Sequence, residues 1–315
     1  MDIKMKIRRF AAEIVCVGVV MAAGGAVHAQ TTATLFSQQM QNKVNFNPAA
    51  VMQKPLFDIA LFGRMQWIGF EDAPKAVMLN ASGYLPYARS GIAGSVMGEG
   101  FGNVLTLNAK LAYSYHVHLG RMNYLSFGIS AGIIYKNLMH NAVVVDGSDP
   151  VLRNEKNNDV KPDVNFGIVL TLRDFQLGLS ATHLTAWAYD RKKDYYAPKE
   201  GYYGYIQYTG NISPKFGMDP YICAYYANET FKVEGALNFR ILDLFWVGGG
   251  YRYSDAAFVT AGIKLGKTFS LGYSYDFGMG GLRKYHSGSH EVYLSLRFET
   301  TRKPAETSET PLFFE

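Results

Sequence analysis

The feature that most constrains this chain is an alternation of apolar and polar side chains with a period of two. It is clearest over residues 290–298, where one face is apolar and the other carries polar and charged groups. The apolar face consists of Val292, Leu294, Leu296 and Phe298. In water this pattern predicts a half-buried β-strand. In a bilayer it predicts a strand with lipid on one side and a polar lumen on the other.

The same alternation recurs along the chain, usually less cleanly, and predicts about 14 strands. Many of the segments have the 9–11 residues that a tilted strand needs to cross a bilayer. The expected strands are 57–65, 75–84, 90–97, 104–116, 123–135, 163–172, 175–184, 203–211, 215–226, 230–240, 244–253, 257–265, 269–277 and 290–298.

The connections between these segments indicate how the strands are arranged. The longest are 136–162, 185–202 and 278–289, all odd-numbered, whereas tight turns such as Arg173-Asp174 are even-numbered. Outer-membrane barrels have short periplasmic turns and long external loops, so this sorting fits a barrel that starts in the periplasm. The alternative is a soluble β-sandwich or barrel, which would bury apolar faces against each other. The sequence therefore predicts an all-β, antiparallel transmembrane β-barrel in the outer membrane.

Aromatic residues provide a further expectation. Tyr and Trp rings suit the headgroup zone, so we expect them near strand ends. The candidates are Trp67, Tyr84, Tyr87, Tyr124, Tyr135, Trp187 and Trp246.

The N-terminus predicts export. Lys4, Lys6, Arg8 and Arg9 precede an apolar run that ends in Val27-His28-Ala29, which is the pattern of a cleavable signal peptide. The expected organisation is a signal peptide over 1–29, a periplasmic or lumen-plugging segment over 30–56, a barrel over 57–298 and a flexible tail over 299–315.

Charge and cysteine content exclude several classes. The formal net charge of +5 is too small to indicate nucleic-acid binding. Cys16 lies in the signal peptide, so only Cys223 remains after cleavage and no intramolecular disulfide can form. No apolar run of about 18 residues follows the signal peptide, so no transmembrane helix is expected.

Candidate catalytic and metal-binding patterns are weak. His116 and His118 would share one face of a strand, but the sequence indicates no third metal ligand. Ser289-His290-Glu291 contains the residue types of a hydrolase, but it lacks the strained elbow that such a nucleophile needs. We therefore predict a protein that is not an enzyme, with no catalytic residues, no cofactor and no metal.

Four pieces of sequence, in order, resemble one family. They are Phe36-Ser37-Gln38-Gln39-Met40 with Asn47-Pro48-Ala49, then residues 64–74 (RMQWIGFEDAP), then Leu111-Ala112-Tyr113-Ser114-Tyr115, and finally Gly288-Ser289-His290-Glu291-Val292. Together they are similar to the PorP/SprF proteins of the Bacteroidota, which are associated with type IX secretion and gliding motility.

The resemblance implies an outer-membrane barrel that works with type IX secretion components in the periplasm or outer membrane. It implies binding that aids export or surface anchoring of proteins with C-terminal sorting domains, at loops 64–75, 136–162, 185–202 and 278–289. The 136–162 loop is charged, with Asp146, Asp149, Arg153, Glu155, Lys156, Asp159 and Lys161. The candidate interaction residues are Asn47, Pro48, Arg64, Gln66, Trp67, Gly69, Ala73, Pro74, Gly288, Ser289, His290 and Glu291.

Two other functions fit the pattern. The first is an outer-membrane channel for small solutes, because a barrel of about 14 strands can be either open or plugged. The second is an outer-membrane lipase or protease, which would need Ser/His/Asp geometry at the barrel rim.

Overall fold

A computed structural model describes residues 36–51, 56–120, 122–138, 158–189, 198–227, 230–279 and 281–299 of the 315. The predicted signal peptide over 1–29 and the tail after Glu299 lie outside the described residues.

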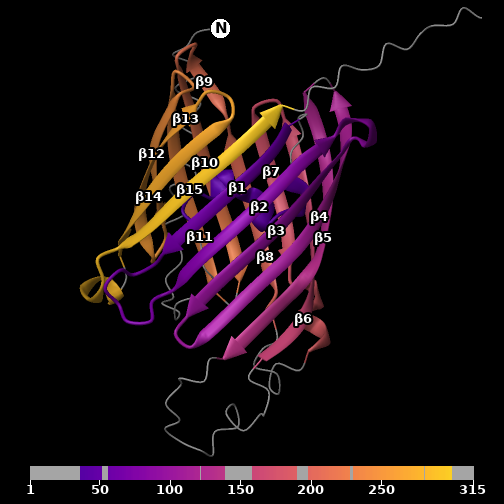
Figure 1. Ribbon diagram of the computed structural model, residues 1–315. Coiled ribbons are helices and arrows are strands. Elements are labelled where there is room, and N and C mark those ends of the chain that lie inside the picture. The colour runs from indigo at the N-terminus through magenta and orange to yellow at the C-terminus, as the bar shows by residue number, and fades with distance from the viewer. Residues whose placement is uncertain are drawn as a thin grey trace, which may run out of the picture. The chain divides into compact units, whose positions relative to one another are not determined.

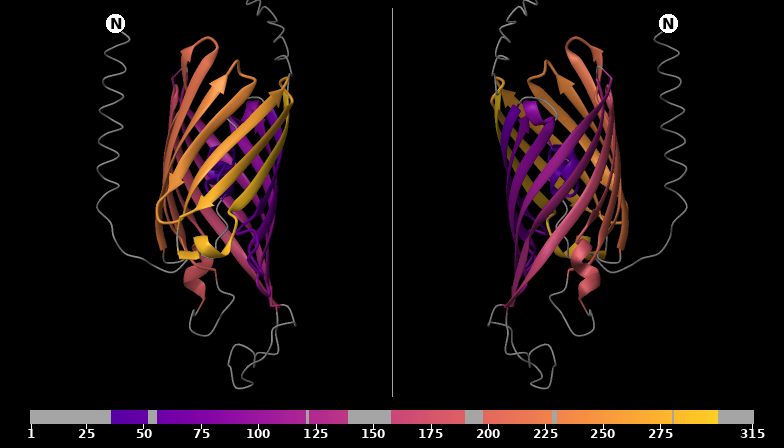
Figure 2. Two further views of the ribbon diagram at one scale, coloured as in Figure 1. Left: turned by 90° about the vertical axis from the view of Figure 1, so that its left-hand side faces the viewer. Right: turned by 90° about the vertical axis from the view of Figure 1, so that its right-hand side faces the viewer.

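One antiparallel sheet forms the fold, and it closes on itself (Figures 1 and 2). Each strand pairs with its neighbours in the sequence, and the first strand pairs with the last, from Leu56 opposite Glu299 to Met65 opposite His290. The strands are β1 (Leu56–Met65), β2 (Lys75–Leu85), β3 (Ser90–Phe101), β4 (Val104–Gly120), β5 (Asn123–Leu138), β6 (Asn158–Leu172), β7 (Phe175–Thr182), β8 (Gly201–Tyr208), β9 (Gly210–Ser213), β10 (Phe216–Ala227), β11 (Thr230–Ile241), β12 (Phe245–Arg252), β13 (Ala256–Leu265), β14 (Phe269–Gly278) and β15 (Ser289–Glu299).

The strands β8 and β9 are two parts of one strand. Both pair with β10, and only Thr209 separates them. The sheet is therefore a closed, antiparallel 14-strand barrel, and both the predicted fold class and the predicted strand number are confirmed.

The alternation of side chains explains why the sheet closes. Outward positions hold exposed apolar residues such as Val77, Leu111 and Leu179, which are 58%, 74% and 58% exposed. Inward positions hold buried polar residues such as Asn80 and Ser114. An apolar outer surface suits hydrocarbon, and a closed sheet leaves no unpaired edge there. A soluble barrel would not expose apolar side chains on every strand.

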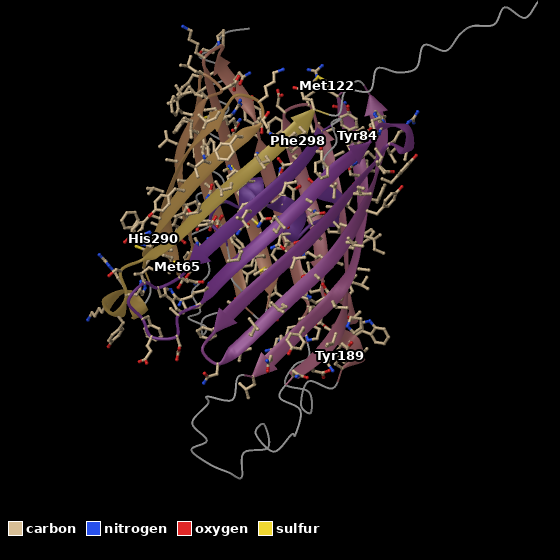
Figure 3. All side chains as sticks on the ribbon, in the orientation of Figure 1. Met65, Tyr84, Met122, Tyr189, His290 and Phe298 are labelled. Carbon is tan, nitrogen blue, oxygen red and sulfur yellow. The ribbon has the colours of Figure 1, made fainter. Side chains whose placement is uncertain are left out.

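The two ends of the barrel differ (Figure 3). Tight turns such as 173–174 and 266–268 lie at one end, which we call the turn end, near Tyr84, Met122 and Phe298. Longer connections lie at the other, which we call the loop end, near Met65 and His290; they include 66–74 and the described parts of the connection between β7 and β8, 183–189 and 198–200.

Several predicted boundaries at the loop end are wrong. The strands β5 and β6 extend to Leu138 and from Asn158, so Asp159 and Lys161 belong to β6 and form an ion pair of 2.8 Å there. Polar residues dominate this extension, so no apolar face marked it as strand. The predicted strand 175–184 ends at Thr182, because the next residue adopts a left-handed conformation.

Residues 36–51, which we call the plug, lie inside the barrel as three short 3-10 helices (indigo in Figures 1 and 2). They are η1 (Gln39–Gln41), η2 (Lys43–Asn45) and η3 (Pro48–Ala50). The barrel wall carries a small residue where one of these helices approaches it. A Cβ atom on Gly128 would lie 2.2 Å from the backbone nitrogen of Ala49, so only glycine allows η3 to approach β5 this closely.

The expectation that Trp246 marks a membrane interface is wrong. Its ring is buried inside the barrel, 6.5 Å from the ring of Tyr293. The residue occupies an inward position of β12, and its side chain packs in the cluster around Phe36 and Phe62.

Among the described helices, none combines the length and apolarity required to cross a membrane.

Candidate functional site

Two aromatic anchors fix the plug to the barrel wall. Phe36 packs edge-to-face on Phe62 of β1, with ring centroids 5.7 Å apart. Phe46 stacks on Tyr203 of β8 at 5.2 Å and contacts Tyr205 edge-on at 5.9 Å. Both anchors are buried, and each belongs to a separate cluster of lumen-facing apolar residues. Burial of one such ring contributes about 1.5–3 kcal/mol.

Asn47 and Pro48 start η3 and attach it to the wall. The Asn47 Oδ1 atom accepts the backbone N–H of Ala49 at 2.9 Å, which caps the helix. Its Nδ2 atom donates to the carbonyl oxygens of Ile168 and Leu179 at 3.3 and 3.1 Å. Pro48 follows at the first helical position, where a missing N–H costs nothing. This part of the first family-like motif is therefore structural and buried.

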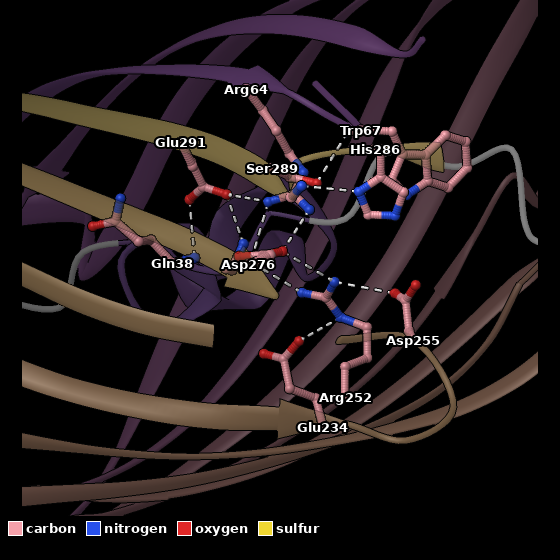
Figure 4. A network of polar contacts seen from close by, with 12 residues as sticks. Gln38, Arg64, Trp67, Glu234, Arg252, Asp255, Asp276, His286, Ser289 and Glu291 are labelled. Atoms are coloured by element: carbon pink, nitrogen blue, oxygen red, sulfur yellow. Dashed lines mark hydrogen bonds and ion pairs between the residues drawn. The ribbon is translucent and has the colours of Figure 1, made fainter. Parts of the chain in front are cut away.

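A buried ion network holds the start of the plug (Figure 4). The Arg64 guanidinium of β1 lies 2.7 Å from Asp276 of β14 and 3.1 Å from Glu291 of β15. The Arg252 guanidinium of β12 lies 2.8 Å from Glu234 of β11. It also lies 3.7 Å from Asp276, which therefore joins the two halves of the network.

The plug completes this network. Glu291 accepts the backbone N–H groups of Ser37 and Gln38 at 2.7 and 3.0 Å. The Ser37 hydroxyl donates to Asp276 at 2.7 Å and accepts from Arg64 at 3.1 Å and Arg252 at 3.3 Å. We call the ion network together with its contacts to the plug the latch. Buried charges are stable only when they are paired and hydrogen-bonded, so the latch requires the plug to be in place.

Two charged groups outside the strands have shifted pKa values. Burial lowers the pKa of Lys43 in η2 to about 8, although Asp219 partly offsets this effect. The Lys43 ammonium donates to Gln176 and, at 2.8 Å, to Gln207. Burial raises the pKa of Asp255 in the 253–255 turn, but the charges of Arg252 and Lys232 outweigh it and leave that pKa below its ordinary value.

The second and fourth family-like motifs meet at the loop end. The backbone N–H of Ile68 donates to Gly288 at 2.8 Å, and that of Ser287 returns to Ile68 at 2.7 Å. The Ser289 hydroxyl accepts the backbone N–H of Trp67 at 3.2 Å. Gly288 has a φ of +87°, and a Cβ atom there would lie 2.5 Å from the hydroxyl of Tyr275.

The remaining residues of the second motif shape the 66–74 loop. Gln66 donates its backbone N–H to Pro74 at 2.9 Å, which closes the loop. Gly69 has a φ of +91° and is exposed, whereas Ala73 is half-buried next to the closure. The Trp67 ring lies 6.3 Å from the ring of Phe70.

The hydrolase-like residues do not converge. Ser289 and Glu291 face the lumen, whereas His290 lies on the opposite face of β15 with its Nδ1 atom 2.5 Å from the hydroxyl of Tyr273. The two candidate metal-binding histidines do not converge either. His116 is buried, with its Nδ1 atom 2.8 Å from the hydroxyl of Ser126, whereas His118 is exposed. No group of three or more potential metal ligands occurs among the described residues.

Sequence reasoning did not single out five members of the latch: Ser37 and Gln38, which were quoted only within the first family-like motif, and Glu234, Arg252 and Asp276. The three charged ones each occupy an inward position of a strand whose outward neighbours are apolar or small. Charges of both signs at such positions were a usable signal for a polar cluster in the lumen. Their pairing was not predictable, because the partners lie on different strands.

The comparison with protein families decides the assignment. The model for the type IX secretion system membrane protein PorP/SprF matches residues 28–296. The chain belongs to the PorP/SprF family. This PorP/SprF protein is therefore an outer-membrane barrel associated with the components of type IX secretion, as its sequence motifs predicted. The family and fold are those of a secretion-system membrane barrel and not of an enzyme class.

The comparison with solved structures finds outer-membrane transporters, of which TodX is similar in fold. The toluene transporter TodX of P. putida is 10% identical, covers 82% of this PorP/SprF chain and 93% of its own, and has a TM-score of 0.50. The toluene transporter TbuX of Ralstonia pickettii is 7% identical, with coverages of 80% and 92% and a TM-score of 0.48. No curated protein matches the chain in sequence.

Proposed function

We propose that this PorP/SprF protein acts by binding, as a plugged barrel that aids the export or surface anchoring of proteins with C-terminal sorting domains. The observation that carries the proposal is the plug. Residues 36–51 occupy the lumen and complete a buried ion network, so the barrel is built to hold its own segment there. A barrel whose lumen is filled by its own segment is suited to bind other proteins at its two ends.

The loop end is the proposed surface for exported proteins. Long connections face the cell exterior in outer-membrane barrels, and residues 1–29 would direct export to that membrane as a cleavable signal peptide. Trp187 in η5 (Leu184–Ala188) and Tyr285 in η6 (Gly281–Tyr285) are 82% and 67% exposed at this end. Exposed aromatic residues are enriched where protein partners bind. Two of its loops are joined by the contacts of Trp67 with Ser289 and of Ile68 with Gly288.

Co-purification tests the proposal. The tagged protein is extracted in a mild detergent, and the eluted proteins are identified by mass spectrometry. We expect type IX components or proteins with C-terminal sorting domains among the eluted proteins. The W187A variant should no longer retain the exported proteins, because the substitution removes an exposed aromatic side chain from the binding surface.

The matched control is I212A. Ile212 is 62% exposed on β9, near the turn end, so its loss should leave the eluted proteins unchanged. Recovery of neither type IX components nor sorting-domain proteins with the unmodified chain would contradict the proposed function.

A further inference from the structure

A cavity of about 560 Å³ lies on the turn-end side of the plug. The plug contributes residues such as Gln41 to its lining, and strand ends next to tight turns contribute others, such as Lys264 and Ser270. The Arg297 side chain also lines it and is 39% exposed, so the cavity opens to solvent at that end. Its volume is in the range of sites that hold small ligands.

Positive charge exceeds negative charge in the lining. The charged residues that line the cavity are Lys43, Asp58, Asp219, Arg240, Lys264 and Arg297. Two of the cations are already paired. Arg240 lies 2.8 Å from Asp219, and Arg297 lies 3.1 Å from Asp58. The charges that remain belong to the two lysines.

The two lysines differ in their surroundings. The Lys43 ammonium is held by the amide oxygens of Gln176 and Gln207. The Lys264 ammonium forms no ion pair and no hydrogen bond with any residue that the structure describes. Lys264 occupies an inward position near the end of β13, so its stem is fixed by the barrel wall while its charge meets the cavity. The cavity therefore presents one ammonium group that has no hydrogen-bond or ion-pair partner among the described residues.

Hydrogen-bond acceptors in the same lining also lack partners. The Oδ1 atoms of Asn80, Asp219 and Asn238 are buried and accept no hydrogen bond from the described residues. Buried acceptors of this kind require donors from water or from a ligand. Peptide N–H groups are donors of the required type.

We propose that this cavity binds a carboxylate-bearing peptide segment of a periplasmic protein, with the carboxylate on Lys264 and peptide N–H groups on the unpartnered acceptors. Lys264 is the cation of the lining that has no hydrogen-bond or ion-pair partner within the described part of the chain, so it is the one available to a carboxylate. A phosphate dianion has too few donors for the three unpartnered acceptors and would place anionic oxygens against them. The site goes beyond the proposed function, because it lies at the opposite end from the loop surface.

The probe is an N-acetylated tripeptide of glycine with a free C-terminal carboxylate, and its C-terminal amide is the neutral comparison. Binding to the detergent-solubilised full chain is measured by calorimetry. We expect the acid to bind about tenfold more tightly than the amide, because a charged hydrogen bond is lost in the amide. Substitution K264Q should reduce the affinity for the acid to that for the amide, whereas K264R should retain a preference for the acid.

The matched control is K267Q. Lys267 lies in the adjacent turn, is 85% exposed and pairs with Glu299, so it should leave binding unchanged. The proposal is overturned if the acid and the amide bind equally, if K264Q binds the acid as well as the unmodified chain does, or if inorganic phosphate binds more tightly than the acid. Folding of K264Q is checked by the heat-dependent shift of the barrel on a gel. The K264R variant keeps the positive charge, so it separates an effect of the charge from an effect of the substitution itself.

Discussion

Deletion of residues 36–51 is expected to convert a barrel that carries little ionic current into an open channel. The plug fills the lumen through two aromatic anchors and the latch, whereas the barrel itself is closed by pairing between its own strands, including β1 with β15. Removal of the plug should therefore leave the fold intact and empty the lumen. The inward residues that remain are largely polar, so water should enter.

Planar-bilayer recording measures this difference. We expect at least a tenfold larger single-channel conductance for the deletion variant than for the unmodified chain. The heat-dependent shift on a gel and a β-sheet circular-dichroism spectrum confirm that the variant is folded. A large, stable conductance of the unmodified chain would favour the alternative function of a channel for small solutes.

Substitution R252M is expected to give the largest loss of stability of any single change to the latch. The substitution leaves the carboxylate of Glu234 buried without the guanidinium that lies 2.8 Å from it. The same guanidinium also pairs with Asp255 and Asp276, which lose this partner as well. An unpaired buried charge costs about 3–5 kcal/mol. Urea titration of the protein folded in phospholipid vesicles measures the free energy of unfolding.

Two further variants separate charge pairing from packing. The double variant R252M/E234Q should recover part of the loss, because the orphaned carboxylate is removed. The control K267M disrupts an exposed ion pair, between groups that are 85% and 53% exposed, and should change the free energy of unfolding by no more than about 1 kcal/mol. Equal effects of R252M and K267M would show that the latch does not stabilise the barrel.

Much of the barrel was predictable because lipid and lumen select opposite residue types on alternate positions. Val292, Leu294 and Leu296 face outward on β15, whereas Glu291 and Ser295 face inward, as the alternation predicted. The same reasoning failed where alternate positions no longer differ in polarity. The extensions of β5 and β6 lie in a polar region, so no apolar face marked them.

The sequence left two alternatives for residues 30–56, a periplasmic segment or a plug in the lumen. Residues 36–51 carry no apolar period, and their contacts join positions far apart in the chain, such as Ser37 with Asp276 and Glu291. The resemblance identified Arg64 and Glu291 as candidates, and both belong to the latch. It could not indicate that they meet, because a one-dimensional pattern contains no information on which inward side chains share a level of the barrel.

The most direct test of the account is whether the plug lies against the wall in the membrane. Asn80 of β2 donates to the side chain of Asn42 at 2.8 Å. In a C223S background, the pair N42C/N80C should be bridged nearly completely by a short bifunctional thiol reagent, with the protein in phospholipid vesicles. The pair N42C/K267C, with one cysteine in an exposed turn, should not be bridged. Equal bridging of both pairs, or of neither, would contradict a plug held inside the barrel.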